Sequence, residues 1–498
     1  MVDDLDRPGE ECGVAGVFSM PGSDIDVART LFFALYAVQH RGQESAGIAT
    51  SDGTGATIHR GMGLVSQVFN EDNLGPLTGH VGLGHNRYST TGHSNLRNIQ
   101  PFLIETLHGP LAVSHNGNLT NAWVLRRDLL RRGVGLSSSS DSEVLTQMLA
   151  MPQGGTNEAH SADWEGRLKD FMGKAQGAYS LAVMTPDALY AARDPHGLRP
   201  LCFGELLDDD GAVVGWLIAS ESPALQTVGA RFIREVAPGE IIRFDKDGVH
   251  SSVAPDLPRK SFCIFEYVYF ARPDAIMEGQ TAHAVRQRMG RILAAESPAD
   301  ADVVIGVPDS SLPAAIGFAD ALGLPYTEGL IKNRYIGRTF IQPSERLRRQ
   351  RVKLKYNVLR ENLEGKRVVV VDDSIVRGTT MGPLVKLIRE GGGASEVHVR
   401  VSSPPVAHPC FMGVDLAEPR DLIAHRMTVD EIRDHVGADS LAYLSQPGLL
   451  RAVAEGNPPE GHCDACFSGR YPIDVSHAIE SSADVKLQFG ATIRDAMP

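Results

Sequence analysis

Cys12 is the first side chain along the sequence that could act as a nucleophile. It opens the segment CGVAGVFSM, whose small residues let other backbone or a ligand approach closely. A lone cysteine before a strand is usually structural, because a free thiol packs as a small hydrophobic side chain. Four later segments weaken that interpretation, since together they supply a cation, side-chain amides and an acid for a free amino acid substrate. They are QHRGQESAGIA (39–49), GHNRYSTTG (84–92), HNGNLTN (115–121) and SSDSE (139–143).

In this order the segments resemble the type 2 glutamine amidotransferases, over about residues 12–240. Each segment alone is weak, because HNGN, for example, is also an ordinary Asn-Gly turn. The resemblance implies an α+β N-terminal-nucleophile hydrolase fold (αββα), with two facing sheets between helices. It also implies that residues 1–11 are a propeptide, cut between Glu11 and Cys12 so that the cysteine becomes the first residue.

Such a cleavage would serve the chemistry directly. A freed α-amine has a pKa of about 7.7–8.0 and can assist a thiol whose pKa is about 8.5, whereas an acylated nitrogen cannot. By the same resemblance, Arg87 binds the glutamine α-carboxylate and Asp141 binds its α-ammonium group. Asn116 and Gly117 would donate hydrogen bonds to the tetrahedral oxyanion. Arg41 is expected to support glutamine binding.

The second candidate site is VVVVDDSIVRGTT (368–380), an aliphatic strand followed by two acids and a hydroxyl-rich turn, before a helix expected near Met381. Free N–H groups and hydroxyls at such a turn favour a phosphate, and adjacent carboxylates suit ribose hydroxyls or Mg²⁺. The alternative is an acidic surface turn. GVPDSSLPAA (306–315) also follows an aliphatic strand and could hold a pyrophosphate, although Asp309 or Ser310 could equally cap a helix there.

The first of these two motifs resembles the phosphoribosylpyrophosphate (PRPP) motif of type I phosphoribosyltransferases. That α/β family has a doubly wound parallel sheet with a ligand crevice at the carboxyl ends of its strands. By resemblance to its glutamine-dependent members, Mg²⁺ would be bound by Ser310, Asp372 and Asp373. The implied PRPP-binding residues are Asp309, Ser311, Lys332, Ser374, Arg377, Gly378, Thr379 and Thr380.

A basic segment, GLIKNRYIGRTFIQPSERLRRQRVKLK (329–355), lies between the two motifs. Lys332, Arg334 and Arg338 resemble the cations of the mobile loop that closes over PRPP and excludes water. The charge run over 346–355 is equally compatible with a solvated face.

Four cysteines of the second half could hold a metal: Cys263, Cys410, Cys463 and Cys466. Four thiolates suit tetrahedral zinc or a 4Fe-4S cluster, and spacing alone favours zinc because His408 and His462 offer further ligands. The surrounding segments resemble instead the amidotransferase branch that has a 4Fe-4S cluster and a propeptide, which implies the cluster. Cys202 has no partner in this scheme and is expected in the core.

Two different architectures are needed to position these residues. In the first half, short alternating apolar runs such as YSLAVM (179–184) predict antiparallel strands, with helical periodicity in stretches such as 27–39 and 141–151. In the second half, continuous aliphatic runs such as DVVIGVP (302–308) alternate with helical patterns. That alternation is typical of buried parallel strands in βαβ units.

The change of pattern predicts two domains. We place the first over 12–245 and the second over 260–480, followed by a C-terminal tail over 481–498. The turn-rich, charged residues 244–260 are the predicted boundary.

The composition excludes several classes of protein. The 498 residues have a formal net charge of −13, which disfavours broad nucleic-acid binding because phosphate affinity comes from Lys and Arg. No run approaches the roughly 20 apolar residues of a membrane span, and the acidic N-terminus lacks a signal-peptide core, which predicts a cytosolic protein. Six cysteines in such a chain favour metal, cluster or catalytic use over a disulfide framework.

The two motif sets together imply an enzyme that releases ammonia from glutamine and transfers it to PRPP. The products would be 5-phosphoribosylamine, pyrophosphate and glutamate, at the start of purine synthesis, in a homo-oligomer inhibited by purine nucleotides. A hexosephosphate aminotransferase would share the first domain but not the PRPP motif. A catalytically inactive PRPP or nucleotide sensor is the other alternative, which Cys12, Arg87 and Asp141 disfavour because a sensor needs no glutamine nucleophile.

Overall fold

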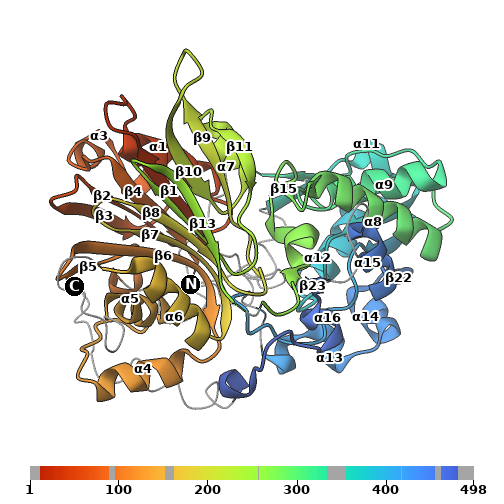
Figure 1. Cartoon of the computed structure of the whole chain (residues 1–498). Helices are drawn as coiled ribbons and strands as arrows, with labels where there is room; N and C mark the ends of the chain where they lie inside the picture. Colours follow the sequence, from red (N-terminus) through yellow and green to blue (C-terminus); the bar gives the residue numbers. More distant parts are fainter. Residues whose placement is uncertain are drawn as a thin grey trace, which may run out of the picture.

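Two lobes make up the computed structural model, a sheet-rich lobe coloured red to yellow-green and a helix-rich lobe coloured green to blue (Figure 1). The structure describes residues 12–88, 96–151, 162–255, 257–333, 355–414, 416, 418–454 and 461–479. The predicted propeptide and tail, together with Arg334 and Arg338, lie outside the described residues. No described helix is long and apolar enough to cross a membrane.

Two antiparallel sheets face each other in the first lobe. Among the described residues, one has seven strands in the order β11-β9-β10-β1-β4-β2-β3 and the other six in the order β13-β12-β8-β7-β6-β5. Side chains of both sheets, among them Phe18, Leu83, Met184 and Phe244, form the core between them. The strands are β1 (Gly13–Ser19), β2 (Ser45–Ser51), β3 (Ala56–Met62), β4 (Val81–Arg87), β5 (Phe102–Thr106), β6 (Gly109–Leu119), β7 (Gly177–Met184), β8 (Leu189–Arg193), β9 (Cys202–Leu207), β10 (Val213–Ala219), β11 (Arg231–Glu235), β12 (Glu240–Asp245) and β13 (Gly248–Val253).

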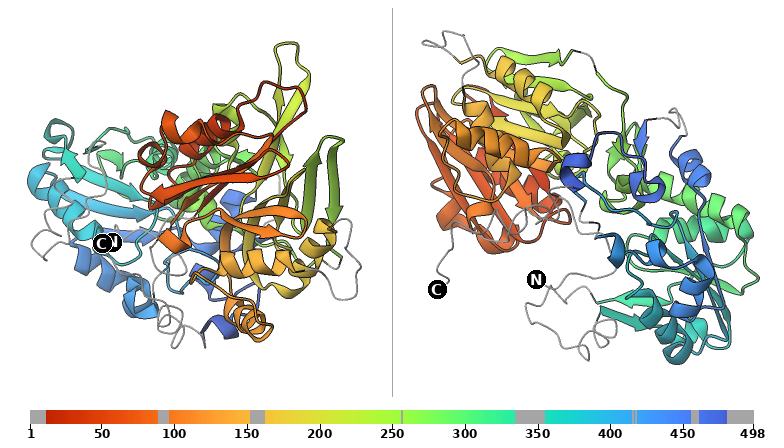
Figure 2. Two further views of the ribbon diagram at one scale, coloured as in Figure 1. Left: turned by 90° about the vertical axis from the view of Figure 1, so that its left-hand side faces the viewer. Right: turned by 90° about the horizontal axis from the view of Figure 1, so that it is seen from below.

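Helices cover the outer face of each sheet, which confirms the predicted αββα arrangement. Leu31 and Leu35 lie one turn apart on α1, so they share the face that packs on the seven-stranded sheet. Leu145 of α5 and Phe171 of α6 pack on the other sheet. Figure 2 shows α1 (red) and α6 (gold) on opposite sides of the paired sheets. The helices of this lobe are α1 (Val27–Ala37), α2 (Val65–Val68), α3 (Glu71–Leu74), η1 (Leu96–Asn98), α4 (Ala122–Arg131), α5 (Asp141–Ala150), α6 (Trp164–Lys174) and α7 (Ser222–Thr227).

The second lobe is built on a parallel sheet in the order β17-β20-β21-β22. Alternate residues of β20 contact different cores: Val369 packs with α8 and α9, and Val370 packs with α12 and α14. The strand is therefore buried on both faces, as its unbroken valine run predicts.

The strands of this lobe form the main sheet and, among the described residues, three short pairs outside it. They are β14 (Phe262–Cys263), β15 (Ile276–Met277), β16 (Gln280–Thr281), β17 (Val303–Gly306), β18 (Leu330–Lys332), β19 (Tyr356–Val358), β20 (Arg367–Asp372), β21 (Glu396–Val401), β22 (Ser440–Tyr443) and β23 (His462–Cys463). The helices are η2 (Glu266–Phe270), α8 (Ala282–Glu296), α9 (Leu312–Leu322), α11 (Arg360–Leu363), α12 (Met381–Lys386), η3 (Leu387–Gly391), η4 (Pro419–Asp421), α13 (Ile423–Arg426), α14 (Val429–Val436), α15 (Gln446–Val453) and α16 (Ala465–Ser468).

The predicted boundary contains a strand that sequence analysis did not identify. Strand β13 pairs with β12 along its whole length, so the sheet of the first lobe extends past residue 245 to Val253. Most side chains of β13 are exposed, because it is an edge strand. It therefore lacks the apolar alternation that marks a half-buried strand.

Two glycines let helices α8 and α9 cross in close contact. A Cβ atom at Gly290 would lie 1.9 Å from the carbonyl oxygen of Ala314. One at Gly317 would lie 2.1 Å from the carbonyl oxygen of Gln287. The backbones of the two helices are therefore in direct contact, and both helices pack in one core with Val369 of β20.

Gly290→Ala should therefore destabilise the second lobe, although alanine is the better helix former. Forcing the two backbones apart should reduce the free energy of unfolding by about 1–3 kcal/mol, measured by urea denaturation. The control is Gly173→Ala in α6, where a Cβ atom meets nothing within 4 Å. That change should be neutral or stabilise by about 0.5–1 kcal/mol. Equal effects of the two substitutions would contradict the close crossing.

Candidate active sites

Cys12 lies directly before β1, beside the end of the neighbouring strand β4. Its side chain is buried, and Sγ donates to the carbonyl oxygen of Tyr88 at 3.5 Å. Burial raises the pKa of the thiol to about 11, an effect that Asp141 strengthens and Arg87 partly offsets. The thiol is therefore protonated near neutral pH, and it needs a base before it can attack a substrate.

Asn116 and Gly117 lie on β6 in the facing sheet. Gly117 has a φ of +146°, and a Cβ atom there would lie 2.0 Å from the carbonyl oxygen of Ala178, so the position requires glycine. Among the described residues, Nδ2 of Asn116 is buried without a hydrogen-bond partner. Leaving such a donor unsatisfied is costly, and functional sites are where such exceptions occur. Among the described residues, the amide nitrogen is thus free to donate to a ligand, as the oxyanion prediction requires.

Arg87 and Asp141 bring opposite charges to the same site. Arg87 ends β4 and Asp141 begins α5, and both side chains are buried. Oδ2 of Asp141 accepts a hydrogen bond from the backbone N–H of Leu119 at 3.0 Å, which fastens the helix start to the end of β6. Both charges act on the Cys12 thiol. The structure therefore brings together the groups predicted to bind the two charged ends of an amino acid.

Arg41 contacts the backbone of Cys12. Its guanidinium is fully buried, and Nε donates to the carbonyl oxygen of Cys12 at 3.2 Å. The same group forms ion pairs with Glu221 at 2.6 Å and Glu266 at 2.8 Å. These contacts suit a supporting role, and a direct contact with glutamine stays a prediction. Sequence analysis missed both glutamates, although Glu266 is a charged residue within the apolar run SFCIFEYVYF.

The two PRPP motifs meet at the carboxyl edge of the parallel sheet, because β17 and β20 are adjacent. Oγ of Ser311 donates to Oδ1 of Asp372 at 3.0 Å. Asp373 accepts hydrogen bonds from Ser310 and, at 2.7 Å, from Ser374. The predicted Mg²⁺ residues therefore lie together, with both carboxylates held by serine hydroxyls.

The alternative prediction that Asp309 or Ser310 caps helix α9 is wrong. The N-cap residue is Ser311, and no side chain caps the helix. The Ser311 hydroxyl lies instead 2.8 Å from the carbonyl oxygen of Val307, so its one hydrogen is shared between this oxygen and Asp372. Asp309 is half exposed and forms an ion pair with Nζ of Lys332 at 2.7 Å, so the predicted cation reaches this loop.

The turn after β20 leads into α12, which begins at Met381 as predicted. Gly378 has a φ of +76°, and a Cβ atom there would lie 2.4 Å from Cδ1 of Ile423. The turn therefore requires glycine at this point. The other predicted ligands of the turn, Arg377, Thr379 and Thr380, are partly or fully exposed.

The four cysteines predicted to hold a metal lie in one region. Cys263 and Cys463 are opposite each other in the parallel pair β14 and β23. Burial raises the pKa of Cys466 well above its ordinary value, and the other three thiols raise it further. Within the described residues, no group of three or more His, Cys, Asp or Glu side chains is arranged to hold a metal ion. Cys202 lies in the core of the first lobe, as predicted.

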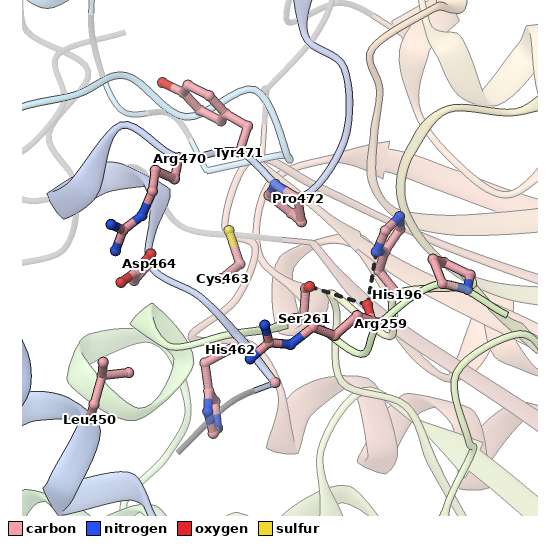
Figure 3. Close-up of a pocket in the computed structure, with 12 residues that line it drawn as sticks. His196, Arg259, Ser261, Leu450, His462, Cys463, Asp464, Arg470, Tyr471 and Pro472 are labelled. Atoms are coloured by element: carbon pink, nitrogen blue, oxygen red, sulfur yellow. Dashed lines mark hydrogen bonds between the residues drawn. The ribbon is translucent and has the colours of Figure 1, made fainter. Parts of the chain in front are cut away.

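A cavity of about 620 Å³ opens beside Cys463 (Figure 3). His196 and Ser261 close one side by hydrogen bonds to the carbonyl oxygen of Arg259, at 3.1 and 3.3 Å. His462, considered above as a zinc ligand, forms a hydrogen bond through Nε2 to Glu278 at 2.8 Å.

Comparison with known proteins finds a matching family for each of the two lobes. The family model of the glutamine amidotransferase domain matches residues 85–227, and that of the phosphoribosyl transferase domain matches residues 278–405. An amidophosphoribosyltransferase from Synechococcus elongatus is 48% identical over 479 residues, covering 96% of this chain and 94% of the relative.

Two solved structures resemble the whole molecule and confirm the predicted fold class. The glutamine PRPP amidotransferase from B. subtilis, complexed with ADP and GMP, is 43% identical with a TM-score of 0.84, covering 93% of this chain and 98% of that one. A structure described as the allosteric regulatory enzyme of purine biosynthesis is 44% identical with a TM-score of 0.85, covering 93% and 97%. The identity over nearly the full length, on the same two-lobed fold, shows that the chain belongs to the amidophosphoribosyltransferase family.

Proposed function

We propose that the first lobe releases ammonia from glutamine at Cys12 and the second transfers it to PRPP at the Asp372 site. The reaction is that of the family, an amidophosphoribosyl transfer that yields 5-phosphoribosylamine, pyrophosphate and glutamate. The observation that carries the proposal is the buried Asn116 amide, a donor without a partner among the described residues, beside a buried thiol. A nucleotide sensor is not favoured, since the relatives matched over nearly the full length are amidophosphoribosyltransferases.

Removal of residues 1–11 would supply the base that the Cys12 thiol needs. The freed α-amine, with a pKa of about 7.7–8.0, would accept the thiol proton as Sγ attacks the glutamine amide carbon. The oxyanion would accept hydrogen bonds from Nδ2 of Asn116 and the N–H of Gly117. The C–N bond then breaks, the α-amine returns the proton to the leaving ammonia, and water hydrolyses the thioester to release glutamate. The raised pKa of the thiol supports the need for this base.

Arg87 and Asp141 would hold glutamine by its two charged ends. A guanidinium can bind the α-carboxylate through two parallel hydrogen bonds, and a carboxylate can accept from the α-ammonium group. Their burial beside Cys12 supports this role, because water screens buried charges less. Arg41 would hold the backbone carbonyl of Cys12 in place by the hydrogen bond from its Nε.

PRPP would bind at the carboxyl edge of the parallel sheet. Its 5′-phosphate fits the turn of residues 374–380, and its diphosphate the loop of Asp309 and Ser311. Ser310, Asp372 and Asp373 offer the oxygen ligands that Mg²⁺ prefers, and the ion would neutralise the departing diphosphate when bound. Ammonia attacks the anomeric carbon, the bond to pyrophosphate breaks and nitrogen loses a proton. Lys332, whose Nζ already lies at this loop, would close over the substrate with Arg334 and Arg338.

A 4Fe-4S cluster with a structural role is also proposed, bound by Cys263, Cys410, Cys463 and Cys466. The gathering of these thiols from three distant segments supports it. In such a cluster each of the four thiolates would bind a different iron. Binding would then add to the folding free energy.

Regulation by purine nucleotides and assembly into a homo-oligomer complete the proposal. The similar B. subtilis protein was solved with ADP and GMP, and the second similar structure is described as an allosteric enzyme. These likenesses support nucleotide binding by this chain as well.

Cys12→Ala should abolish glutamine-dependent synthesis, by on the order of 10³-fold or more, because no other group can form the thioester. Synthesis from ammonia should persist, since ammonia bypasses the first site. Both rates are measured as phosphoribosylamine formed from PRPP. Cys202→Ala, which removes a core thiol of the same lobe, is the control and should keep glutamine use. Glutamine-dependent activity in Cys12→Ala would exclude Cys12 as the nucleophile.

Replacing Asp372 and Asp373 together by Asn should cripple PRPP use with either nitrogen donor. Both carboxylates would lose the charge that binds Mg²⁺ and the ribose hydroxyls, while glutamine binding should be retained. The measurement is kcat/KM for PRPP with glutamine and with ammonia. Asp302→Asn is the matched control, because Asp302 lies at the opposite end of the sheet, paired with Arg367 at 2.9 Å. Unchanged PRPP kinetics in the double variant would refute the assignment.

Protein prepared anaerobically should contain about four irons and four sulfides per chain, with visible absorbance. Cys410→Ser should lose most of the iron and unfold at lower urea concentration, because it removes one ligand. Cys202→Ser should keep the iron. One zinc and no iron in the unaltered chain would defeat the proposal.

A further inference from the structure

Glu266 of the second lobe contacts Arg41 of the first lobe, next to Cys12. This residue begins the π-helix η2, and its carboxylate binds the guanidinium of Arg41 through two hydrogen bonds of 2.8 and 3.0 Å. Arg41 in turn holds the carbonyl oxygen of Cys12. Both charged side chains are fully buried, so no water screens the pair.

Residues 411–413 of the second lobe also contact β6, next to the predicted oxyanion donors Asn116 and Gly117. Nδ2 of Asn118, next to Gly117, donates to the carbonyl oxygen of Phe411 at 2.9 Å. Gly413 has a φ of +101°, and a Cβ atom there would lie 3.0 Å from the carbonyl carbon of Gly117. The backbone of residues 411–413 therefore packs directly against the end of β6 that carries the predicted oxyanion donors.

One arginine joins these two contacts. Arg199 is fully buried and donates through Nε to the carbonyl oxygen of Met412 at 3.0 Å. Its NH1 lies 3.8 Å from the carboxylate of Glu266. The contact behind Cys12 and the contact on Gly117 therefore belong to one buried network of charged side chains and backbone carbonyls.

Stability alone is a poor explanation for this network. Burying ions costs several kcal/mol each, and well-packed apolar side chains can be equally stable in their place. What charged groups add is fixed geometry, because each hydrogen bond specifies a distance and a direction. Fixed geometry matters here, since a misplacement of 1 Å can cost about 10²-fold in rate.

We propose that Glu266 and Asn118 are positioning residues of the glutaminase reaction, through which the second lobe fixes Cys12 and the Gly117 end of β6 relative to each other. Neither residue is among those proposed above to contact glutamine. The proposal rests on the proposed roles of Cys12, Asn116 and Gly117, and it adds that the first lobe does not by itself hold a complete site.

The test uses the full-length chain with Asn118→Ala and Glu266→Gln. Glutamate release should fall by about 10- to 100-fold in kcat, while KM for glutamine changes by less than about 3-fold. Ammonia-dependent phosphoribosylamine synthesis should stay within about 2-fold, because both changes lie outside the PRPP site. The matched control is Asn121→Ala, since Nδ2 of Asn121 donates to the carbonyl oxygen of Lys174 at the same 2.9 Å but within the first lobe.

Alkylation of Cys12 by iodoacetamide separates the two contacts. This reaction needs a reactive thiol but no oxyanion donor, so Asn118→Ala should alkylate at the normal rate and Glu266→Gln more slowly. A normal kcat in both variants, or an equal loss of ammonia-dependent synthesis, would overturn the proposal.

The outcomes also distinguish this proposal from the function on which it rests. Glutamine use by Cys12→Ala would refute the proposed function, whereas loss in Cys12→Ala with normal rates in both positioning variants would refute positioning alone. If Glu266→Gln does not fold, as loss of all activity would show, Asn118→Ala decides the question, because its partly buried hydrogen bond joins neutral groups.

Discussion

The buried charge of Arg41 constrains much of the structure around it. A guanidinium cannot shed its proton in a protein, so complete burial obliges it to find anionic partners. Glu221 supplies one from the first lobe and Glu266 another from the second. Burial alone would raise the pKa of Glu221, but His40 and Arg41 hold it well below its ordinary value. Separating the lobes would leave the buried Glu266 without Arg41, and an uncompensated buried charge is strongly destabilising.

The sequence contained the local parts of this arrangement. Alternation predicted β7, a valine run predicted β20, and helical periodicity predicted α5, because each signal is carried by residues adjacent in the chain. Strand β13 was not predicted, because an exposed edge strand needs no apolar side chains. Motif resemblance, rather than periodicity, identified Cys12 and its companions, because a site assembled from separate strands leaves no local pattern.

Contacts between the lobes could not be predicted in the same way. The Arg41 to Glu266 bond joins residues 225 positions apart, and the Asn118 to Phe411 bond joins residues 293 apart. A glutamate within an apolar run does indicate a buried partner, since a lone buried charge is too costly. Nothing in the run says that the partner is an arginine of the other lobe.

Helix η2 also links the network to Asp373, one of the residues proposed to bind Mg²⁺. Arg286 of α8 donates to the carbonyl oxygens of Tyr267 and Ala271, both at 2.8 Å. Burial lowers the pKa of Arg286 to about 10, and the negative charge of Asp373 partly offsets that effect. The helix is thus bound to Arg41, which holds the carbonyl oxygen of Cys12, and to Arg286, whose charge interacts with that of Asp373. Cys12 and Asp373 lie in different lobes, yet a movement of η2 would disturb both Arg41, which holds the Cys12 carbonyl, and Arg286, whose charge interacts with Asp373.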